Sequence, residues 1–214
     1  MTEQEARTQL LASGVSRETL DRLNALAGLI AKWTKRINLI SPTSVERIWS
    51  RHILDSAQIG RHGPLTVATW ADLGSGGGLP GLVVAALRSG VDTSLETTLI
   101  ESDQRKCAFL STASREIGVN ARILAQRVET IVDVSFDVVS ARALAPMDRL
   151  LCLAQPLTAE GGRMLFLKGA NAQAELTAAN ETWNMEVVRH QSVTDPAATI
   201  LDVRKAVRRH EHLG

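Results

Sequence analysis

The residues best suited to chemistry are the glycines that follow a short apolar run near residue 70. The run Thr69–Leu73 leads into Gly74, Gly76 and Gly78, and Pro80 then opens a predicted helix. Glycine lets the main chain turn sharply and lets a ligand approach it closely. Ligands of open parallel sheets lie at the carboxyl ends of the strands. A glycine-rich turn at this position therefore predicts a nucleotide-like ligand.

The spacing of these glycines separates the ligand classes. Counting from Gly74, the third glycine of a GxGxxG dinucleotide motif falls on Leu79, and the chain carries no Gly-Lys-Ser/Thr of a P-loop. A GxGxG loop after a strand and an acidic residue, here Asp72, resembles the first motif of Rossmann-type methyltransferases. In those enzymes the loop wraps the methionine part of S-adenosylmethionine. We take Gly74, Gly76 and Leu79 as candidate cofactor residues; a tight turn without a ligand is the alternative.

Polar residues follow the next two predicted strands. Glu101 stands roughly twenty residues beyond the loop, where a carboxylate can accept both ribose hydroxyls of an adenosine. A solvated acidic strand end is the alternative. Ser102 and Asp103 either contact the ribose or adenine or cap the following helix. Methyltransferases commonly hold the adenine edge after the next strand, where Val128 and Glu129 stand.

These residues need an α/β sheet to bring them together. Beyond residue 63, short apolar runs alternate with helical patterns, which predicts a parallel, doubly wound, Rossmann-like sheet. The predicted strands are Val67–Leu73, Thr97–Glu101, Ala121–Ala125, Phe136–Ser140 and Arg163–Lys168, with two more runs at Glu186–Val193 and Ile200–Lys205. The predicted helices are Pro80–Ser89, Gln104–Ile117, Met147–Ala154 and Ala172–Thr182.

The N-terminal part of the chain is predicted to be helical. Thr2 with Glu5 and Thr43 with Glu46 match capping boxes, and Ser16 suits an N-cap. The second box is expected to open a helix that runs to residue 60. We divide the chain into an N-terminal helical extension, 1–63, and a Rossmann-like domain, 64–214, that form one compact unit.

Composition excludes several classes of protein. The chain has 214 residues, 44% of them hydrophobic and 22% charged, and its net charge of +1 gives no global basic field, so a nucleic acid would need a local patch. Cys107 and Cys152 lack CxxC spacing, so we expect reduced cysteines and no metal site. No apolar run reaches the roughly 18 residues of a membrane span, and Glu3 and Glu5 do not suit a signal peptide. We expect a cytoplasmic monomer without a membrane partner.

Further stretches indicate a family. These are WTKRINLIS (33–41), RHILDS (51–56), GLPG (78–81), VSARA (139–143) and LKG (167–169). Together they resemble the bacterial small-subunit ribosomal RNA guanine-N7 methyltransferases, also called glucose-inhibited division protein B, over roughly residues 10 to 207. RHILDS joined to GLPG is the most specific combination.

This resemblance implies a Rossmann-type methyltransferase with an N-terminal helical extension, which moves a methyl group from S-adenosylmethionine to N7 of one guanine in 16S rRNA. The small ribosomal subunit would then be its partner. The resemblance puts the following residues in the cofactor site, the last three at the ribose edge: Gly74, Leu79, Val128, Glu129, Arg142, Glu101, Ser102 and Asp103.

Arg142 ends the fourth predicted strand, and no general base is needed beside it. Its guanidinium could pair with the cofactor carboxylate, an RNA phosphate or a structural carboxylate. Guanine N7 carries a lone pair and no proton, so alignment of the reacting atoms supplies the rate. We therefore assign no catalytic side chain.

Basic residues concentrate in the N-terminal helices and near the C-terminus, which suits phosphate contacts. A solvated helix face is the alternative, with Arg51 and Asp55 as an ordinary i,i+4 pair and His52 as a buried, hydrogen-bonded side chain. The candidate RNA-binding residues are Lys35, Arg36, Arg51, His52, Lys168 and Arg204.

One departure from the family and several rival functions remain. Many relatives carry an Arg-His pair before the last strand, where this chain has the run 198–203, ATILDV. That difference puts the substrate geometry in doubt. The rivals are a methyltransferase for a small molecule or protein, and a non-catalytic RNA-binding module for ribosome assembly. A dinucleotide oxidoreductase ranks last because Leu79 replaces the third glycine.

Overall fold

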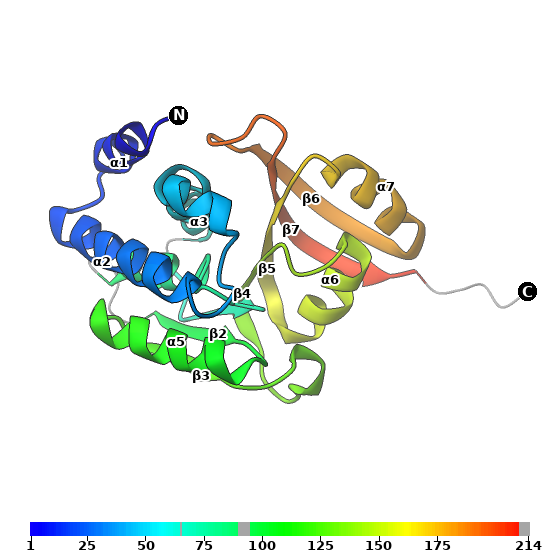
Figure 1. The fold of residues 1–214 in the computed structure, drawn as a ribbon. Coiled ribbons are helices and arrows are strands. Elements are labelled where there is room, and N and C mark those ends of the chain that lie inside the picture. Colours follow the sequence, from blue (N-terminus) through cyan, green and yellow to red (C-terminus); the bar gives the residue numbers. More distant parts are fainter. Residues whose placement is uncertain (65, 90–94, 210–214) are drawn as a thin grey trace, which may run out of the picture.

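The structure is a computed structural model that describes residues 1–64, 66–89 and 95–209. Within these residues, seven strands form one sheet in the order β3-β2-β1-β4-β5-β7-β6 (Figure 1). The strands are β1 (Thr69–Leu73), β2 (Glu96–Ile100), β3 (Ala121–Leu124), β4 (Phe136–Arg142), β5 (Thr158–Lys168), β6 (Trp183–Gln191) and β7 (Thr199–Arg208). The chain order reverses between β1 and β4, so the switch point lies where the glycine loop leaves β1.

The sheet is mixed, which corrects the prediction of a wholly parallel one. Strands β1 to β5 pair in parallel, but β7 runs antiparallel to both β5 and β6. A parallel neighbour needs a crossover of a dozen or more residues. The segment 192–198 between β6 and β7 is too short for that, so the two strands form a hairpin.

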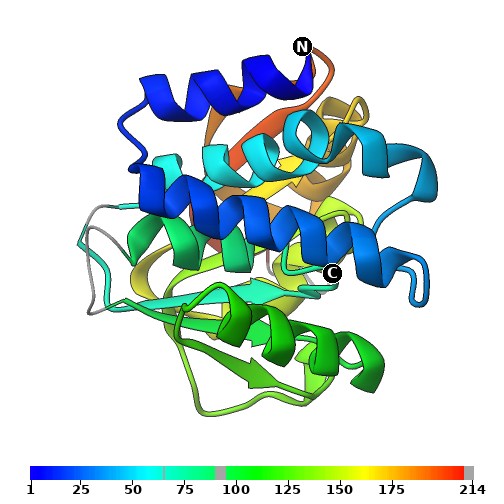
Figure 2. The same cartoon turned by 60° about the vertical axis from the view of Figure 1, so that its left-hand side comes forward.

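Helices cover both faces of the sheet. Figures 1 and 2 show the N-terminal helices stacked on one side, while α6 and α7 lie on the other. The helices are α1 (Glu3–Ala12), α2 (Arg17–Thr34), α3 (Leu54–His62), α4 (Gly81–Arg88), α5 (Gln104–Glu116), α6 (Met147–Ala154) and α7 (Ala172–Thr182). No helix of the described residues is both long and apolar enough to cross a lipid bilayer.

The N-terminal caps follow the prediction, but the segment after α2 does not. Thr2 and Glu5 form the capping box of α1, and Ser16 caps α2. The box predicted at Thr43 and Glu46 is wrong. A 3₁₀-helix (Pro42–Arg47) begins one residue earlier, without a side-chain cap, and a π-helix (Trp49–Ile53) leads into α3. Proline suits the first turn of a helix, and the Thr43 hydroxyl pairs with that of Ser41 instead of a main-chain amide.

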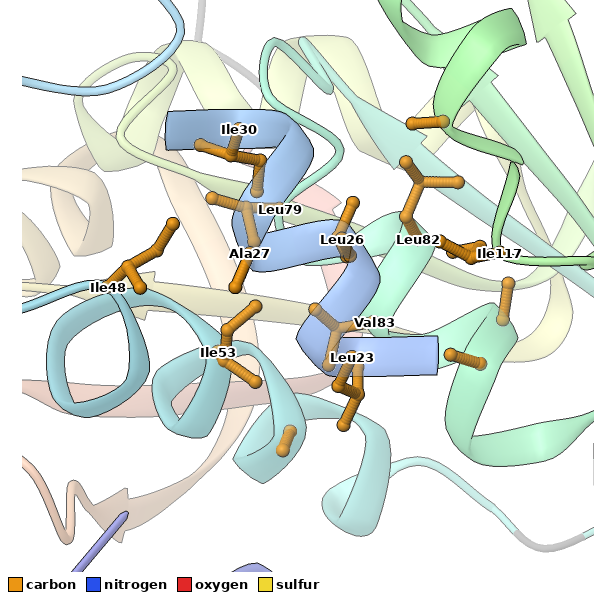
Figure 3. Close-up of a cluster of buried hydrophobic side chains, with 14 of the residues drawn as sticks. Leu23, Leu26, Ala27, Ile30, Ile48, Ile53, Leu79, Leu82, Val83 and Ile117 are labelled. Atoms are coloured by element: carbon orange, nitrogen blue, oxygen red, sulfur yellow. The ribbon is translucent and has the colours of Figure 1, made fainter. Parts of the chain in front are cut away.

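The hydrophobic core is continuous across residue 63. Leu23, Leu26 and Ile30 of α2 share one hydrophobic cluster with Leu82 and Val83 of α4, and all five side chains are fully buried (Figure 3). Burying a leucine or valine side chain contributes roughly 1.5–3 kcal/mol. The helical extension is therefore fastened to the helices of the sheet by packing and not by a linker alone.

Candidate functional site

The glycine loop is held at both ends by Asp72, a fully buried residue of β1. Its Oδ2 accepts a hydrogen bond from the Gly81 amide at 3.1 Å, and its Oδ1 accepts one from the Ser140 hydroxyl at 2.9 Å. Gly81 packs so closely on β2 that an added Cβ would lie 2.3 Å from Cδ2 of Leu99. Gly74 has φ +63°, a conformation that favours glycine. Strand, loop and helix are thus one tightly joined unit.

Glu101 links the end of β2 to this loop. Its Oε2 accepts a hydrogen bond from the Gly76 amide at 3.0 Å, and its Oε1 accepts bonds from the Ser102 and Asp103 amides at 2.8 and 2.9 Å. A carboxylate has about four acceptor sites, so Glu101 keeps capacity for a further donor. The residue is 8% exposed. The site therefore contains a fixed carboxylate beside the glycine loop.

The Asp103 side chain caps α5. It accepts hydrogen bonds from the amides of Arg105 and Lys106. A hydrogen bond from the Arg105 guanidinium is the largest cause of the lowered pKa of the Asp103 carboxyl, and the two amides add to it. Of the two roles open from the sequence, the helix cap is the one observed. Ser102 beside it is exposed.

A cavity of about 500 Å³, which we call the glycine-loop cavity, lies beside Gly74 and Glu101. Segments 126–129 and 142–146 also line it. Six predicted cofactor residues line it: Gly74, Glu101, Ser102, Val128, Glu129 and Arg142. The sequence reasoning missed Lys106 and the apolar residues 144–146, which belong to no motif.

Leu79 does not line this cavity with the other candidates, and its assignment by position stays a prediction. Its side chain is 4% exposed and belongs to the core that α2 covers. An apolar side chain gains more from that burial than from facing a polar ligand. Glu129 lines the cavity, and its carboxylate pairs with Arg149 at 3.1 Å. Both partners are exposed, so this ion pair contributes little to stability.

A second cavity of about 660 Å³, which we call the His52 cavity, is also lined by segment 142–146. Arg51, His52 and Asp55 line it from the RHILDS stretch, and Thr194 and Asp195 line it from the β6–β7 connection. Because residues 142–146 line both cavities, the two cavities adjoin at this segment, which we call the wall.

The wall is held from behind by Lys168. Its ammonium donates to the Ala145 carbonyl at 2.7 Å and pairs with Glu175 at 2.6 Å, and the Glu175 carboxylate also accepts the Met147 amide. Lys168 is 7% exposed. Lys168 also lines the His52 cavity, so its role as an RNA contact stays a prediction, with the Ala145 carbonyl and the Glu175 carboxylate as its present partners.

Arg142 and His52 form a pair at the edge of the His52 cavity. The Arg142 guanidinium donates to Nδ1 of His52 at 2.8 Å, and Nε2 of His52 lies 2.8 Å from the Ser44 hydroxyl. Burial, together with the charges of Arg142 and Arg51, lowers the pKa of His52 to about 3, so the ring is neutral. A neutral ring that accepts at Nδ1 carries its proton at Nε2 and donates to Ser44. His52 is thus the hydrogen-bonded side chain that the sequence left open.

Arg142 does not form a structural ion pair, because no carboxylate of the described residues lies within 4.0 Å of it. Burial lowers the pKa of Arg142, and the charges of Asp55 and Asp72 oppose that shift. Arg51 and Asp55 do not pair either, so the i,i+4 pair that the sequence left open as an alternative is not observed among the described residues.

The other predicted RNA contacts are exposed side chains, of which Arg51 lines the His52 cavity. Lys35 and Arg36 are exposed at the end of α2, just before the segment 39–41 that lines the His52 cavity. Arg51 is exposed at the cavity itself. Arg204 lies on β7, 3.6 Å from the buried carboxylate of Asp202.

Comparison with known proteins agrees with this geometry. The model of the family rRNA small subunit methyltransferase G (GidB) matches residues 19–203. Ribosomal RNA small subunit methyltransferase G of Paramagnetospirillum magneticum is 46% identical over 93% of this chain and 95% of its own length. The protein of the same name from Cereibacter sphaeroides is 48% identical over 90% and 93%.

A solved structure supports the fold. The N-methyltransferase NodS from Bradyrhizobium japonicum, in complex with S-adenosyl-L-homocysteine, has a TM-score of 0.53 at 14% identity, over 82% of this chain and 97% of that one. The fold is that of Rossmann-type S-adenosylmethionine-dependent methyltransferases with N-terminal helices added. With the family model matching residues 19–203 and relatives of nearly the same length, the chain belongs to the rRNA small subunit methyltransferase G family.

Proposed function

We propose that this protein transfers the methyl group of S-adenosylmethionine to N7 of a guanine in 16S rRNA. The observation that carries the proposal is the pair of cavities that share the wall 142–146. A methyl donor on one side and a base on the other would meet at this wall. The names of the close relatives support RNA of the small subunit as the acceptor.

The residues of the glycine-loop cavity fit the cofactor. Its volume of about 500 Å³ is typical of a small-ligand site. Glu101 would accept the ribose hydroxyls, the loop at Gly74 would border the methionine part, and the main chain at Val128 and Glu129 would border the adenine. When bound, the sulfonium supplies an activated methyl group.

The protein's own contribution is alignment and the exclusion of water. Guanine N7 has a free lone pair, so no side chain has to remove a proton when the methyl group is transferred. Lys168 and Glu175 fix the wall, and residues 143–146 present an apolar surface at the meeting point. Holding reactants in an attack geometry supplies a large part of the rate in such reactions.

RNA would approach from the His52 cavity. Lys35, Arg36 and Arg51 are exposed near it and can contact phosphates. Ala198 lines the same cavity, in the run where many relatives carry an Arg-His pair. The RNA must therefore be held there by other groups.

The test is methyl transfer to small ribosomal subunits from cells that lack the endogenous enzyme. We expect label from S-adenosylmethionine at one guanine, identified as N7-methylguanine by mass spectrometry of rRNA digests. Label in metabolites or protein with none in RNA would favour the rival acceptors. Binding of S-adenosylhomocysteine without any transfer would favour a non-catalytic assembly module.

A loop variant tests the placement of the donor. Gly74→Ala adds a Cβ at φ +63° and 2.6 Å from Cδ1 of Leu144 in the wall, so calorimetry should show at least a tenfold loss of S-adenosylhomocysteine affinity. Gly161→Ala is the matched control, because it has φ +74° and open space around it. Normal binding by Gly74→Ala would show that the donor lies elsewhere.

A further inference from the structure

Asp55 presents an unused carboxylate oxygen to the His52 cavity. It lies in the first turn of α3, and its Oδ1 accepts hydrogen bonds from the Thr194 hydroxyl and from Nε2 of Gln58, the latter at 3.3 Å. No residue that the structure describes donates to Oδ2. Oδ2 is not fully enclosed by protein either, so it faces open space in the cavity that Asp55 lines.

The same cavity presents unused donors from Arg142. One terminal nitrogen of the guanidinium donates to His52 and lies 3.5 Å from the Arg51 carbonyl. Nε and the second terminal nitrogen donate to no partner in the described part of the chain. Asp55 and Arg142 are close enough to act on each other electrostatically. The cavity therefore combines one acceptor and one donor group, with the apolar Leu144 and Pro146 beside them.

This combination matches guanine and not adenine. Along its Watson–Crick edge, guanine has the donors N1–H and N2–H₂ next to the acceptor O6, whereas adenine has an acceptor at N1 and a donor at N6. Enzymes that modify bases commonly read a flipped-out base along this edge. A guanine held in this way keeps N7 free of hydrogen bonds and available to the wall 142–146.

We propose that Asp55 makes this protein specific for guanine, by accepting hydrogen bonds from N1–H and N2–H₂ of the target base while Arg142 donates to O6. Thr194 and Gln58 hold the carboxylate in place for this contact. The inference rests on the proposed guanine-N7 methylation, and it adds the residue that chooses the base.

The test combines a variant with a base analogue. The probes are small subunits reconstituted on 16S rRNA that carries either guanine or inosine at the methylated position; inosine keeps O6 and N7 but lacks the 2-amino group. For the wild type, we expect inosine to lower kcat/KM for methyl transfer by about tenfold, as expected for one base-edge contact. For Asp55→Asn, guanine should react about 10- to 100-fold more slowly, and inosine should lower the rate by less than about twofold.

Asp148→Asn is the matched control. Oδ1 of Asp148 also accepts one hydroxyl and one N–H, from Thr182 and Trp183, but this residue borders neither cavity. In this variant, inosine should lower kcat/KM as much as it does in the wild type. Calorimetry with S-adenosylhomocysteine should show that both variants bind the donor as the wild type does.

The outcomes separate the two proposals. If the wild type methylates no guanine in the rRNA, the proposed function fails. If it methylates guanine but inosine costs the same in wild type and Asp55→Asn, the assignment of Asp55 is overturned. If Asp55→Asn does not fold, the wild type alone still decides, because equal rates on guanine and inosine would contradict a carboxylate that reads the 2-amino group.

Discussion

Asp72 illustrates how a single buried residue sets the geometry of the loop. Burial raises the pKa of its carboxyl to about 6, although hydrogen bonds from Ser140 and Gly81 act in the opposite direction. Its bond to Gly81 holds the end of β1 to the start of α4, and its bond to Ser140 holds β1 to β4. Burial makes this carboxyl costly to ionise, but its two oxygens fix both neighbours of the loop.

Asp72 should give the protein a specific dependence of stability on pH. A carboxyl whose pKa is raised on folding stabilises the fold below its unfolded pKa, and this contribution is lost as pH rises through the folded value. The wild type should therefore lose about 2–3 kcal/mol of unfolding free energy relative to Asp72→Asn between roughly pH 4 and 6. Urea unfolding of both proteins at each pH measures this difference.

Asp137 gives the opposite control for that experiment. Hydrogen bonds from Thr69 and Ala68 lower the pKa of its carboxyl. The difference between wild type and Asp137→Asn should therefore shrink as pH falls below about 4. If the difference in unfolding free energy between wild type and Asp72→Asn stays constant from pH 4 to 7, burial does not raise the pKa of Asp72.

At the scale of the element, α1 holds the π-helix that carries Arg51 and His52. The Glu3 carboxylate accepts hydrogen bonds from the amides of Trp49 and Ser50, at 2.8 and 3.0 Å, and from the Ser50 hydroxyl at 2.7 Å. The Arg7 guanidinium lies over the Trp49 ring at 4.8 Å. The first helix is therefore part of the support of the His52 cavity.

Replacing Glu3 should weaken this support. Glu3→Gln turns an acceptor that serves three donors into an amide with one oxygen, so we expect a loss of about 1–3 kcal/mol of unfolding free energy and faster hydrogen exchange at residues 49–53. Methyl transfer to RNA should fall more than S-adenosylhomocysteine binding does. Glu18→Gln is the control, since Glu18 makes only an exposed i,i+4 pair with Arg22. Unchanged exchange in Glu3→Gln would contradict the role of α1.

Sequence periodicity predicted most elements because their burial is local. Helices α6 and α7 have the predicted bounds, and Glu101 lies next to the loop where its spacing indicated. The π-helix could not be predicted, because distant groups such as Glu3 stabilise it. The wall 143–146 carries no polar motif, and only its position between two cavities reveals its role. The bond from Lys168 to the Ala145 carbonyl could not be predicted either, because a lysine beside a strand end gives no sign of the carbonyl that it will meet.

At the scale of the whole molecule, the continuous core predicts that the extension and the sheet unfold together. Residues of α2 and α3 share one hydrophobic cluster with α4 and α5, so the extension and the sheet bury each other's apolar surface. A boundary between domains usually has few contacts across it. By contrast, the division at residue 63 runs through a shared hydrophobic cluster. The expectation of a single compact unit can therefore be tested by unfolding.

The tryptophans are placed to report on both parts of the chain. Trp33 and Trp49 lie in the N-terminal helical region, and Trp70 and Trp183 lie in the sheet. We expect a variant that keeps only Trp49 and a variant that keeps only Trp183, with the other tryptophans replaced by phenylalanine, each to give one fluorescence midpoint in urea. That midpoint should coincide with the midpoint from far-UV circular dichroism of the same variant, as in two-state unfolding. The comparison within each variant cancels the stability cost of the substitutions themselves.

If the Trp49 signal changes before the circular dichroism does, the helical extension unfolds first and the chain is two units. Because α2 packs against Leu82 and Val83, we expect the two curves to overlay.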